Sequence, residues 1–103
     1  PELTEAQRQA RQRLLDRARQ AAKALKERFG VGRVILFGSL AHANWFELEG
    51  DVDLAVEGLA TGDYWQAWGL AEEIIGERPV DLLEVEKAPE PLRRAIDRHG
   101  VDL

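Results

Sequence analysis

Two short groups of residues in this sequence carry side chains that could do chemistry. The first is Gly38-Ser39, which follows an apolar run at 34–37. A Gly-Ser turn before a helix offers backbone N–H groups and a hydroxyl to phosphate oxygens. The second group is Asp51 and Asp53, separated by one residue at the start of another apolar segment, so that both carboxylates point to one face of a strand. Such carboxylates hold Mg²⁺ ions that bridge phosphates, and together the two groups suit a nucleoside triphosphate.

Each group is a weak signal alone. A Gly-Ser pair after a strand is commonly only a turn, and Asp-x-Asp at a strand start is commonly a solvated edge. Their conjunction is more informative, because both groups lie at strand ends, where the ligand sites of open sheets gather. The reaction that the combination indicates is nucleotidyl transfer.

These residues resemble the signature of the minimal nucleotidyltransferases in the DNA polymerase β-like superfamily, which has Gly-Ser, a linker, Asp-x-Asp and a third Asp on a later strand. By this resemblance the third carboxylate is Asp81. The resemblance covers nearly the whole chain. It implies that Asp51, Asp53 and Asp81 are catalytic and bind two Mg²⁺ ions. It also implies that ATP is the substrate, with Gly38 and Ser39 binding its phosphates.

The chain departs from the family pattern after Gly-Ser. The family usually continues with a small residue, an Arg and a Gly, whereas this chain has Ala41-His42-Ala43. We expect His42 to take the place of the Arg in nucleotide binding, although a surface histidine is an equal alternative. The linker at 40–50 is also one residue longer than usual. Because of these departures, the alternative remains that the chain is a family member that has lost its activity.

The elements that must position these residues follow from the apolar pattern. Apolar residues recur at three- and four-residue steps from Leu3 to Phe29, which predicts one long amphipathic helix between an N-cap at Thr4 and a stop at Gly30. Strands are predicted at 33–37, 51–57 and 80–85, and helices at 39–43, 63–76 and 90–98. The expected fold is α/β (α+β), a small mixed β-sheet covered by helices on one face. We expect a single domain, 1–103.

Strand parity predicts where the carboxylates point. Val52, Leu54 and Val56 form one apolar face of their strand, which leaves Asp51 and Asp53 on the other. Asp81 precedes Leu82 in the same alternation, so that all three carboxylates would share a cleft. Clustered like charges are unfavourable unless a cation or a proton intervenes, which favours a metal site over ordinary edge charges.

Composition limits the class of partner. Residues 1–29 carry eight basic and four acidic side chains, a net +4. Residues 30–103 carry six basic and fifteen acidic ones, a net −9, and the chain totals −5. The acidic half holds the predicted site, which argues against direct nucleic-acid binding. Cysteine is absent and there is no apolar run of membrane-spanning length, so we expect a cytoplasmic protein without a membrane partner.

The resemblance also implies a partner. The chain lacks the helical domain that binds the acceptor in larger members. Stand-alone minimal domains often act as antitoxins of all-helical HEPN-type ribonuclease toxins, in some cases by moving AMP from ATP to a tyrosine hydroxyl of the toxin. We expect this activity. The alternatives are an antitoxin that acts by binding alone, and the transferase half of a two-subunit enzyme for small molecules. Trp65 could contact a partner or lie at the edge of the core.

Overall fold

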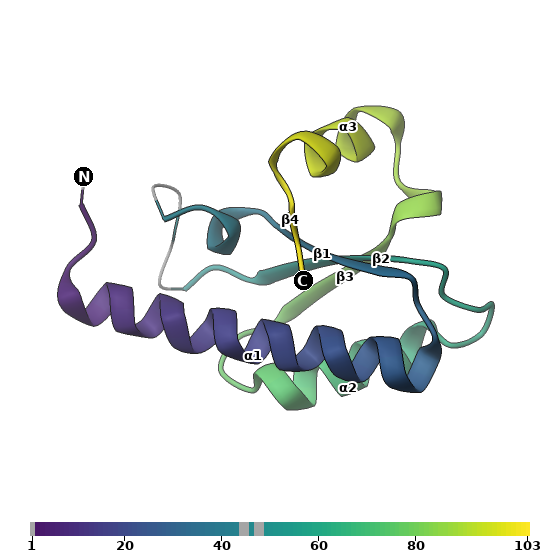
Figure 1. The fold of residues 1–103 in the computed structure, drawn as a ribbon, viewed down its shortest axis with the longest axis horizontal. Coiled ribbons are helices and arrows are strands. Elements are labelled where there is room, and N and C mark those ends of the chain that lie inside the picture. Colours follow the sequence, from purple (N-terminus) through teal and green to yellow (C-terminus); the bar gives the residue numbers. More distant parts are fainter. Residues whose placement is uncertain (1, 44–45, 47–48) are drawn as a thin grey trace.

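The structure is a computed structural model that describes residues 2–43, 46 and 49–103. Three helices and a four-stranded sheet make up the fold (Figure 1). The elements are α1 (Glu5–Phe29), β1 (Arg33–Phe37), the 3₁₀ turn η1 (Ser39–Ala41), β2 (Val52–Glu57), α2 (Tyr64–Ile75), β3 (Val80–Glu84), the 3₁₀ turn η3 (Val85–Lys87), α3 (Glu90–His99) and β4 (Val101–Asp102). The strand order is β3-β2-β1-β4, with β2 parallel to β3 and the other pairs antiparallel. The predicted fold class is confirmed.

Helix α1 begins and ends where local signals predicted. The Thr4 side chain accepts a hydrogen bond from the Gln7 backbone N–H, and the Gln7 side chain accepts one from the Thr4 N–H, which completes a capping box. Gly30 ends the helix in the left-handed conformation at φ 67°. One stripe of the helix is buried, including Leu14, Ala21 and Leu25. Local sequence therefore defines this element at both ends.

The main core lies between the sheet and the pair α1 and α2. The even-numbered residues of β2 are fully buried here: Val52, Leu54 and Val56 expose 1% or less of their surface. Burial of one such side chain stabilises the fold by about 1.5–3 kcal/mol. The parity predicted for this strand is confirmed, and its odd-numbered residues face the other side.

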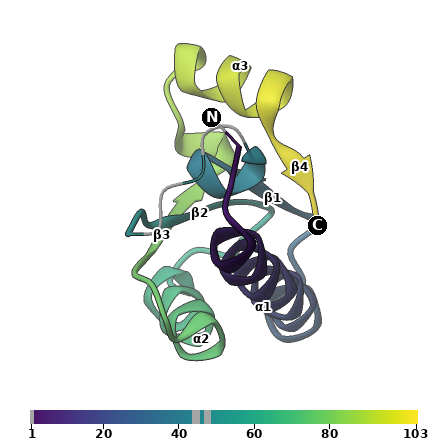
Figure 2. The ribbon, with the colours of Figure 1, turned by 90° about the vertical axis from the view of Figure 1, so that its left-hand side faces the viewer.

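Helix α3 covers part of that other side, whereas the sequence led us to expect helices on one face only (Figure 2). Ile96 of α3 packs in a second small cluster with Ile35 and Ala55 of the sheet. Ala55 follows Asp53 by two residues along β2, and Ile35 is its register partner on β1. Both are apolar, so this stretch of the face requires a cover. The site is consequently confined to one end of the sheet.

Strand β3 forms one edge of the sheet, and side chains of α2 satisfy its outer backbone groups. Tyr64 Oη donates to the Leu82 carbonyl at 2.5 Å and Trp68 Nε1 donates to the Val80 carbonyl at 2.9 Å. Glu72 accepts from the Val80 N–H at 2.5 Å. The three side chains are spaced four residues apart and so lie on one stripe of α2. They protect this edge from pairing with another strand.

Other differences from the predicted elements are small. The helix predicted at 39–43 is a single 3₁₀ turn, and β4 was not predicted as a strand. Strand β2 begins at Val52, so Asp51 immediately precedes it. No helix in the part of the chain that the structure describes combines the length and the apolar character needed to cross a membrane.

Candidate active site

The strand register brings two of the predicted carboxylates together. Strands β2 and β3 are parallel, and Asp53 and Asp81 are paired in register, so their side chains leave the sheet on the same face. On the other side of β2, Asp53 is paired with Phe37, the last residue of β1. The Gly-Ser turn that follows Phe37 therefore begins beside Asp53.

Gly38 is in contact with the Asp53 carboxylate. Its backbone has φ 73° and ψ −158°, a conformation that residues other than glycine rarely adopt. A Cβ on Gly38 would collide with Asp53 Oδ2 and would lie 3.0 Å from Asp53 Cγ. Glycine is required here both by its conformation and by this approach. The predicted phosphate-binding turn and the predicted metal-binding carboxylate thus belong to one site.

The turn itself is held from both faces of the sheet. On the α1 side, the Arg11 guanidinium donates to the Leu40 carbonyl at 3.0 Å. On the α3 side, His42 Nε2 lies 2.7 Å from the His99 carbonyl oxygen, and the two imidazole rings meet edge to face at 6.2 Å. The first N–H groups of such a turn have no partner within it and can donate to a phosphate. Ser39 is half-buried at the start of this turn.

The carboxylates create an acidic environment. The pKa of Asp53 is raised from 3.8 to about 6, first by burial and then by the negative charges of Asp81 and Asp51. Asp51 and Asp81 are themselves exposed. Burial, with Asp81 and Glu84, also raises the pKa of Tyr64, whose ring lies at the neighbouring edge of the sheet. A cation placed at Asp53 would relieve these repulsions.

The donor set suits Mg²⁺, which is commonly held by one or two carboxylates together with substrate phosphates. Asp53 and Asp81 supply oxygen ligands in register, and Gly38 leaves the Asp53 carboxylate room. Among the described residues, however, no three His, Asp or Glu side chains are grouped to hold a metal ion by themselves. The geometry therefore fits an ion whose coordination is completed by other ligands, such as phosphate oxygens.

Two features of the site were outside the reach of sequence reasoning. Arg11 holds the turn, yet it is separated from Leu40 by 29 residues and looks like any other arginine of a solvated helix. The bond of His42 to α3 was also missed, because it joins residues 57 apart. This bond gives His42 a structural role, and nucleotide binding by His42 stays a prediction. The predicted linker residues Asn44, Trp45, Glu47 and Leu48 lie outside the described residues.

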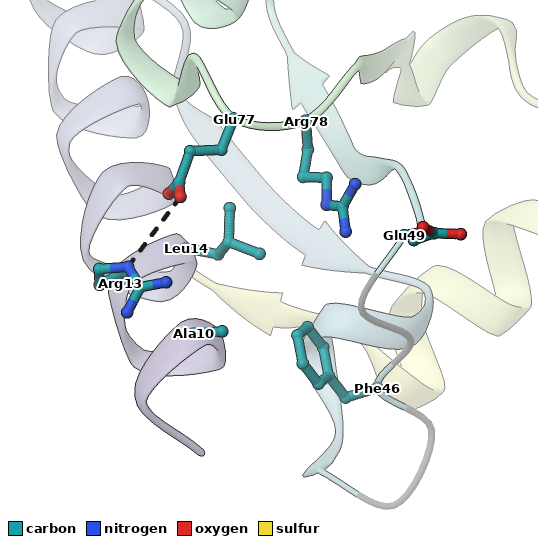
Figure 3. Close-up of a pocket in the computed structure, with 7 residues that line it drawn as sticks. All are labelled: Ala10, Arg13, Leu14, Phe46, Glu49, Glu77 and Arg78. Carbon is teal, nitrogen blue, oxygen red and sulfur yellow. Dashed lines mark ion pairs between the residues drawn. The ribbon is translucent and has the colours of Figure 1, made fainter. Parts of the chain in front are cut away.

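A pocket of about 300 Å³ lies near the site, between α1 and the turn after α2 (Figure 3). Arg13 and Glu77 form an ion pair at 4.0 Å on its wall, and Arg78 reaches across it from the turn before β3. The lining residues are Ala10, Arg13, Leu14, Phe46, Glu49, Glu77 and Arg78. None of the three predicted catalytic carboxylates lines this pocket, so it is separate from the site at the Gly-Ser turn.

Comparisons with known proteins agree with this geometry. A family model described as polymerase beta, nucleotidyltransferase, matches residues 19–103. A solved structure described as a minimal nucleotidyltransferase is 30% identical, with a TM-score of 0.69 over 86% of this chain and 92% of that chain. No curated protein sequence matches this chain.

A second solved structure shares the fold. It is an MNT antitoxin in complex with a tri-AMPylated HEPN toxin of Shewanella oneidensis, 18% identical, with a TM-score of 0.53 over 93% of this chain and 70% of that chain. The family model covers most of the chain, and the first solved structure matches 86% of it. These two matches establish the family of the chain. The chain belongs to the polymerase β nucleotidyltransferases and is similar in sequence and fold to a minimal nucleotidyltransferase.

Proposed function

We propose that this nucleotidyltransferase moves AMP from ATP to a tyrosine hydroxyl of a HEPN-type toxin and thereby acts as its antitoxin. The observation that carries the proposal is the contact between Gly38 and the Asp53 carboxylate, with Asp81 in register beside it. Because of this contact, the phosphate-binding turn and the metal-binding carboxylates can act on the same substrate. The partner class is supported by the fold shared with an antitoxin that was solved with its AMPylated toxin.

In this proposal the backbone at Gly38 and the Ser39 hydroxyl bind and orient the triphosphate. Asp51, Asp53 and Asp81 would hold two Mg²⁺ ions, which supply Lewis-acid stabilisation of the phosphates and of the attacking oxygen. The acceptor hydroxyl oxygen forms a bond to the α-phosphorus, and the bond from that phosphorus to the bridging oxygen breaks, releasing pyrophosphate. Asp81, which is exposed, would either ligate one of these ions or accept the hydroxyl proton and pass it to water.

A second candidate function is neutralisation by binding alone. The observation that favours it is the bond of His42 to the His99 carbonyl, at the place where related enzymes have an arginine. A histidine whose Nε2 is engaged in this way lacks the fork of N–H donors with which an arginine binds a phosphate. The carboxylate pair favours transfer, because unpaired carboxylates in register are costly to retain for binding alone.

Co-expression with a HEPN-type toxin from the same genome separates the two functions. We expect the wild-type chain to protect cells from the toxin. The Asp53→Asn, Asp81→Asn double variant keeps the size of both side chains and removes both charges, so it should fold and yet fail to protect. Full protection by the double variant would reject transfer in favour of neutralisation by contact.

A further inference from the structure

Asp81 lies on an edge strand of the sheet. Strand β3 is five residues long and has a neighbouring strand on one side only, β2. The Asp81 side chain is exposed, so its position beside Asp53 depends on the backbone of β3. The groups of a reactive site have to be held within about 0.5 Å of their working positions, and an edge strand opens more readily than a strand paired on both sides. What holds the outer side of β3 therefore bears directly on the site.

Two side chains of α2 bond to the residues on either side of Asp81. Tyr64 Oη donates to the Leu82 carbonyl at 2.5 Å, and Trp68 Nε1 donates to the Val80 carbonyl at 2.9 Å. Both carbonyls belong to the outer row of backbone groups that an edge strand leaves unpaired. The backbone is therefore fixed immediately before and immediately after Asp81.

Glu72 completes this arrangement. Its carboxylate accepts from the Val80 N–H at 2.5 Å, so that both outer backbone groups of Val80 are bonded to side chains of α2. The helix itself is anchored in the core by three completely buried residues, Ala67, Ala71 and Ile75. We call the three bonding side chains the α2 clamp: Tyr64, Trp68 and Glu72.

The two aromatic rings of the α2 clamp are supported in turn by Trp65. This side chain has 73% of its surface exposed and lies outside the core. Its ring meets the Tyr64 ring edge to face at 5.0 Å and the Trp68 ring at 6.0 Å. Aromatic pairs in this arrangement attract each other beyond the effect of the area that they bury. Trp65 therefore helps to fix both rings, and contact of Trp65 with a partner stays a prediction.

The α2 clamp does more than cover the edge of the sheet. An edge can be protected by a charge, a bulge or a short strand, none of which fixes the backbone. Here three partly buried hydrogen bonds fix it, and all of them fall on the neighbours of Asp81. The charge of Asp81 also reaches Tyr64, because the pKa of the Tyr64 phenol is raised by burial and then by the charges of Asp81 and Glu84. The placement favours a role in setting the position of Asp81.

We infer that the α2 clamp positions Asp81, by holding the β3 backbone so that the Asp81 carboxylate stays beside Asp53, where both can bind one cation. This inference rests on the proposed function for the role of Asp81. The three side chains act through the backbone of β3, so they are positioning residues and not catalytic ones.

A double-mutant cycle between Tyr64 and Asp81 tests the inference. Tyr64→Phe removes only Oη and its bond to β3, so the chain should remain folded. It should weaken the Kd of Mn²⁺, titrated with ATP present and without toxin, about tenfold, as loss of a residue that orients a metal ligand does. In the Asp81→Asn background, where Asp53 and the Gly-Ser turn remain, the same substitution should change the Kd less than about twofold. A general loss of stability would affect both backgrounds alike.

Two further positions separate positioning from stability. Ile75→Val lies on the same helix and should destabilise the fold about as much as loss of one hydrogen bond, yet it should leave the Kd of Mn²⁺ unchanged. Glu72→Met removes the acceptor for the Val80 N–H and should weaken Mn²⁺ binding as Tyr64→Phe does. Glu72→Gln keeps an acceptor oxygen and should retain most of the affinity.

Hydrogen exchange without metal gives a second readout. The amides of Asp81 and Leu83 alternate along β3 with the outward Val80 N–H, so they face β2. Both should exchange faster in Tyr64→Phe than in Ile75→Val, because the α2 clamp holds β3 against β2.

The outcomes separate the inference from the proposed function. A loss of Mn²⁺ affinity in Tyr64→Phe that disappears in the Asp81→Asn background supports the inference. If Tyr64→Phe acts equally in both backgrounds, or no more strongly than Ile75→Val, the bonds only stabilise the fold and the inference is wrong, while the proposed function stands. If the wild-type chain binds Mn²⁺ with ATP no more tightly than the Asp53→Asn, Asp81→Asn double variant, the metal site and the inference are overturned together.

Discussion

Gly38 and Asp53 are in contact at the end of the sheet, and each restricts the other. The carboxylate fills the space where a side chain on Gly38 would lie, and the backbone of Gly38 has a positive φ of 73° with an extended ψ of −158°. A substitution at Gly38 therefore acts twice, through backbone strain and through displacement of a carboxylate. At the scale of single residues, this contact is the feature on which the site depends.

Gly38→Ala should lower the free energy of unfolding by about 1–3 kcal/mol and weaken ATP binding in the presence of Mg²⁺ at least about tenfold. Gly62→Ala is the matched control, since Gly62 also has a positive φ of 93° but has nothing within 4 Å of an added Cβ. Gly62→Ala should lower the free energy of unfolding without weakening ATP binding. Calorimetric titration and urea unfolding measure both quantities. Equal ATP binding by the two variants would contradict the role of Gly38.

The raised pKa of Asp53 predicts a pH dependence of stability. Folding moves this pKa from 3.8 to about 6, so the folded state favours the protonated carboxyl and loses stability as the pH rises through this window. The loss should be about 1–2 kcal/mol, because solvent screens a half-exposed carboxylate. Asp53→Asn should remove it. Urea unfolding of both chains between pH 4 and pH 7 would show a difference that grows with pH up to about 6 and is then constant; parallel curves would contradict the prediction.

At the scale of elements, the Gly-Ser turn is positioned by two helices that approach it from opposite faces of the sheet. Arg11 of α1 reaches the Leu40 carbonyl, and the last residue of α3 receives His42. A single 3₁₀ turn has few hydrogen bonds of its own, so these two contacts contribute much of its order. The helices therefore serve the site as well as the core.

Arg11→Met keeps much of the length of the side chain and removes its bond to the turn. Loss of one such bond should lower the free energy of unfolding by about 0.5–1.5 kcal/mol. Hydrogen exchange at the Ala41 and His42 amides should become faster, since both amides bond back into the turn. Arg19→Met is the control, because Arg19 is exposed and pairs with Asp16 on its own helix. Identical exchange at these amides in the two variants would show that Arg11 does not order the turn.

How far the sequence predicts each element depends on where its determinants lie. The bounds of α1 follow from Thr4 and Gly30, which are local signals, and the face of Asp53 follows from simple alternation along β2. Strand β4 has two residues and exists only through its pairing with β1, so no local pattern indicates it. The position of α3 and the contacts of Arg11 and His42 likewise join distant segments. Long-range packing, which a single sequence does not display, decides these features.

At the scale of the whole molecule, the two faces of the sheet have different tasks. Helices α1 and α2 bury the larger core on one face, and α3 covers only part of the other, which leaves the carboxylates at one end (Figure 2). The charges of Asp81 and Asp51 act on Asp53 at this end. Binding of a divalent cation with ATP should therefore stabilise the whole fold.

Mn²⁺ with ATP should raise the melting temperature of the wild-type chain, because a ligand at a hundredfold excess over its Kd stabilises the folded state by about 2.7 kcal/mol. The Asp53→Asn, Asp81→Asn double variant should not respond. Without ligand, the double variant should melt at the same or a higher temperature, since the repulsion between the two carboxylates is gone. A wild-type melting temperature that is indifferent to millimolar Mn²⁺ and ATP would reject the metal site.

The most direct test of the account is the intact mass of a HEPN-type toxin after incubation with this chain, ATP and Mg²⁺. We predict that the mass increases by whole adenylate units on tyrosine with the wild-type chain, and that it does not change with the Asp53→Asn, Asp81→Asn double variant or without ATP. An unchanged toxin mass with the wild-type chain, under conditions in which the two proteins form a complex, would contradict adenylate transfer.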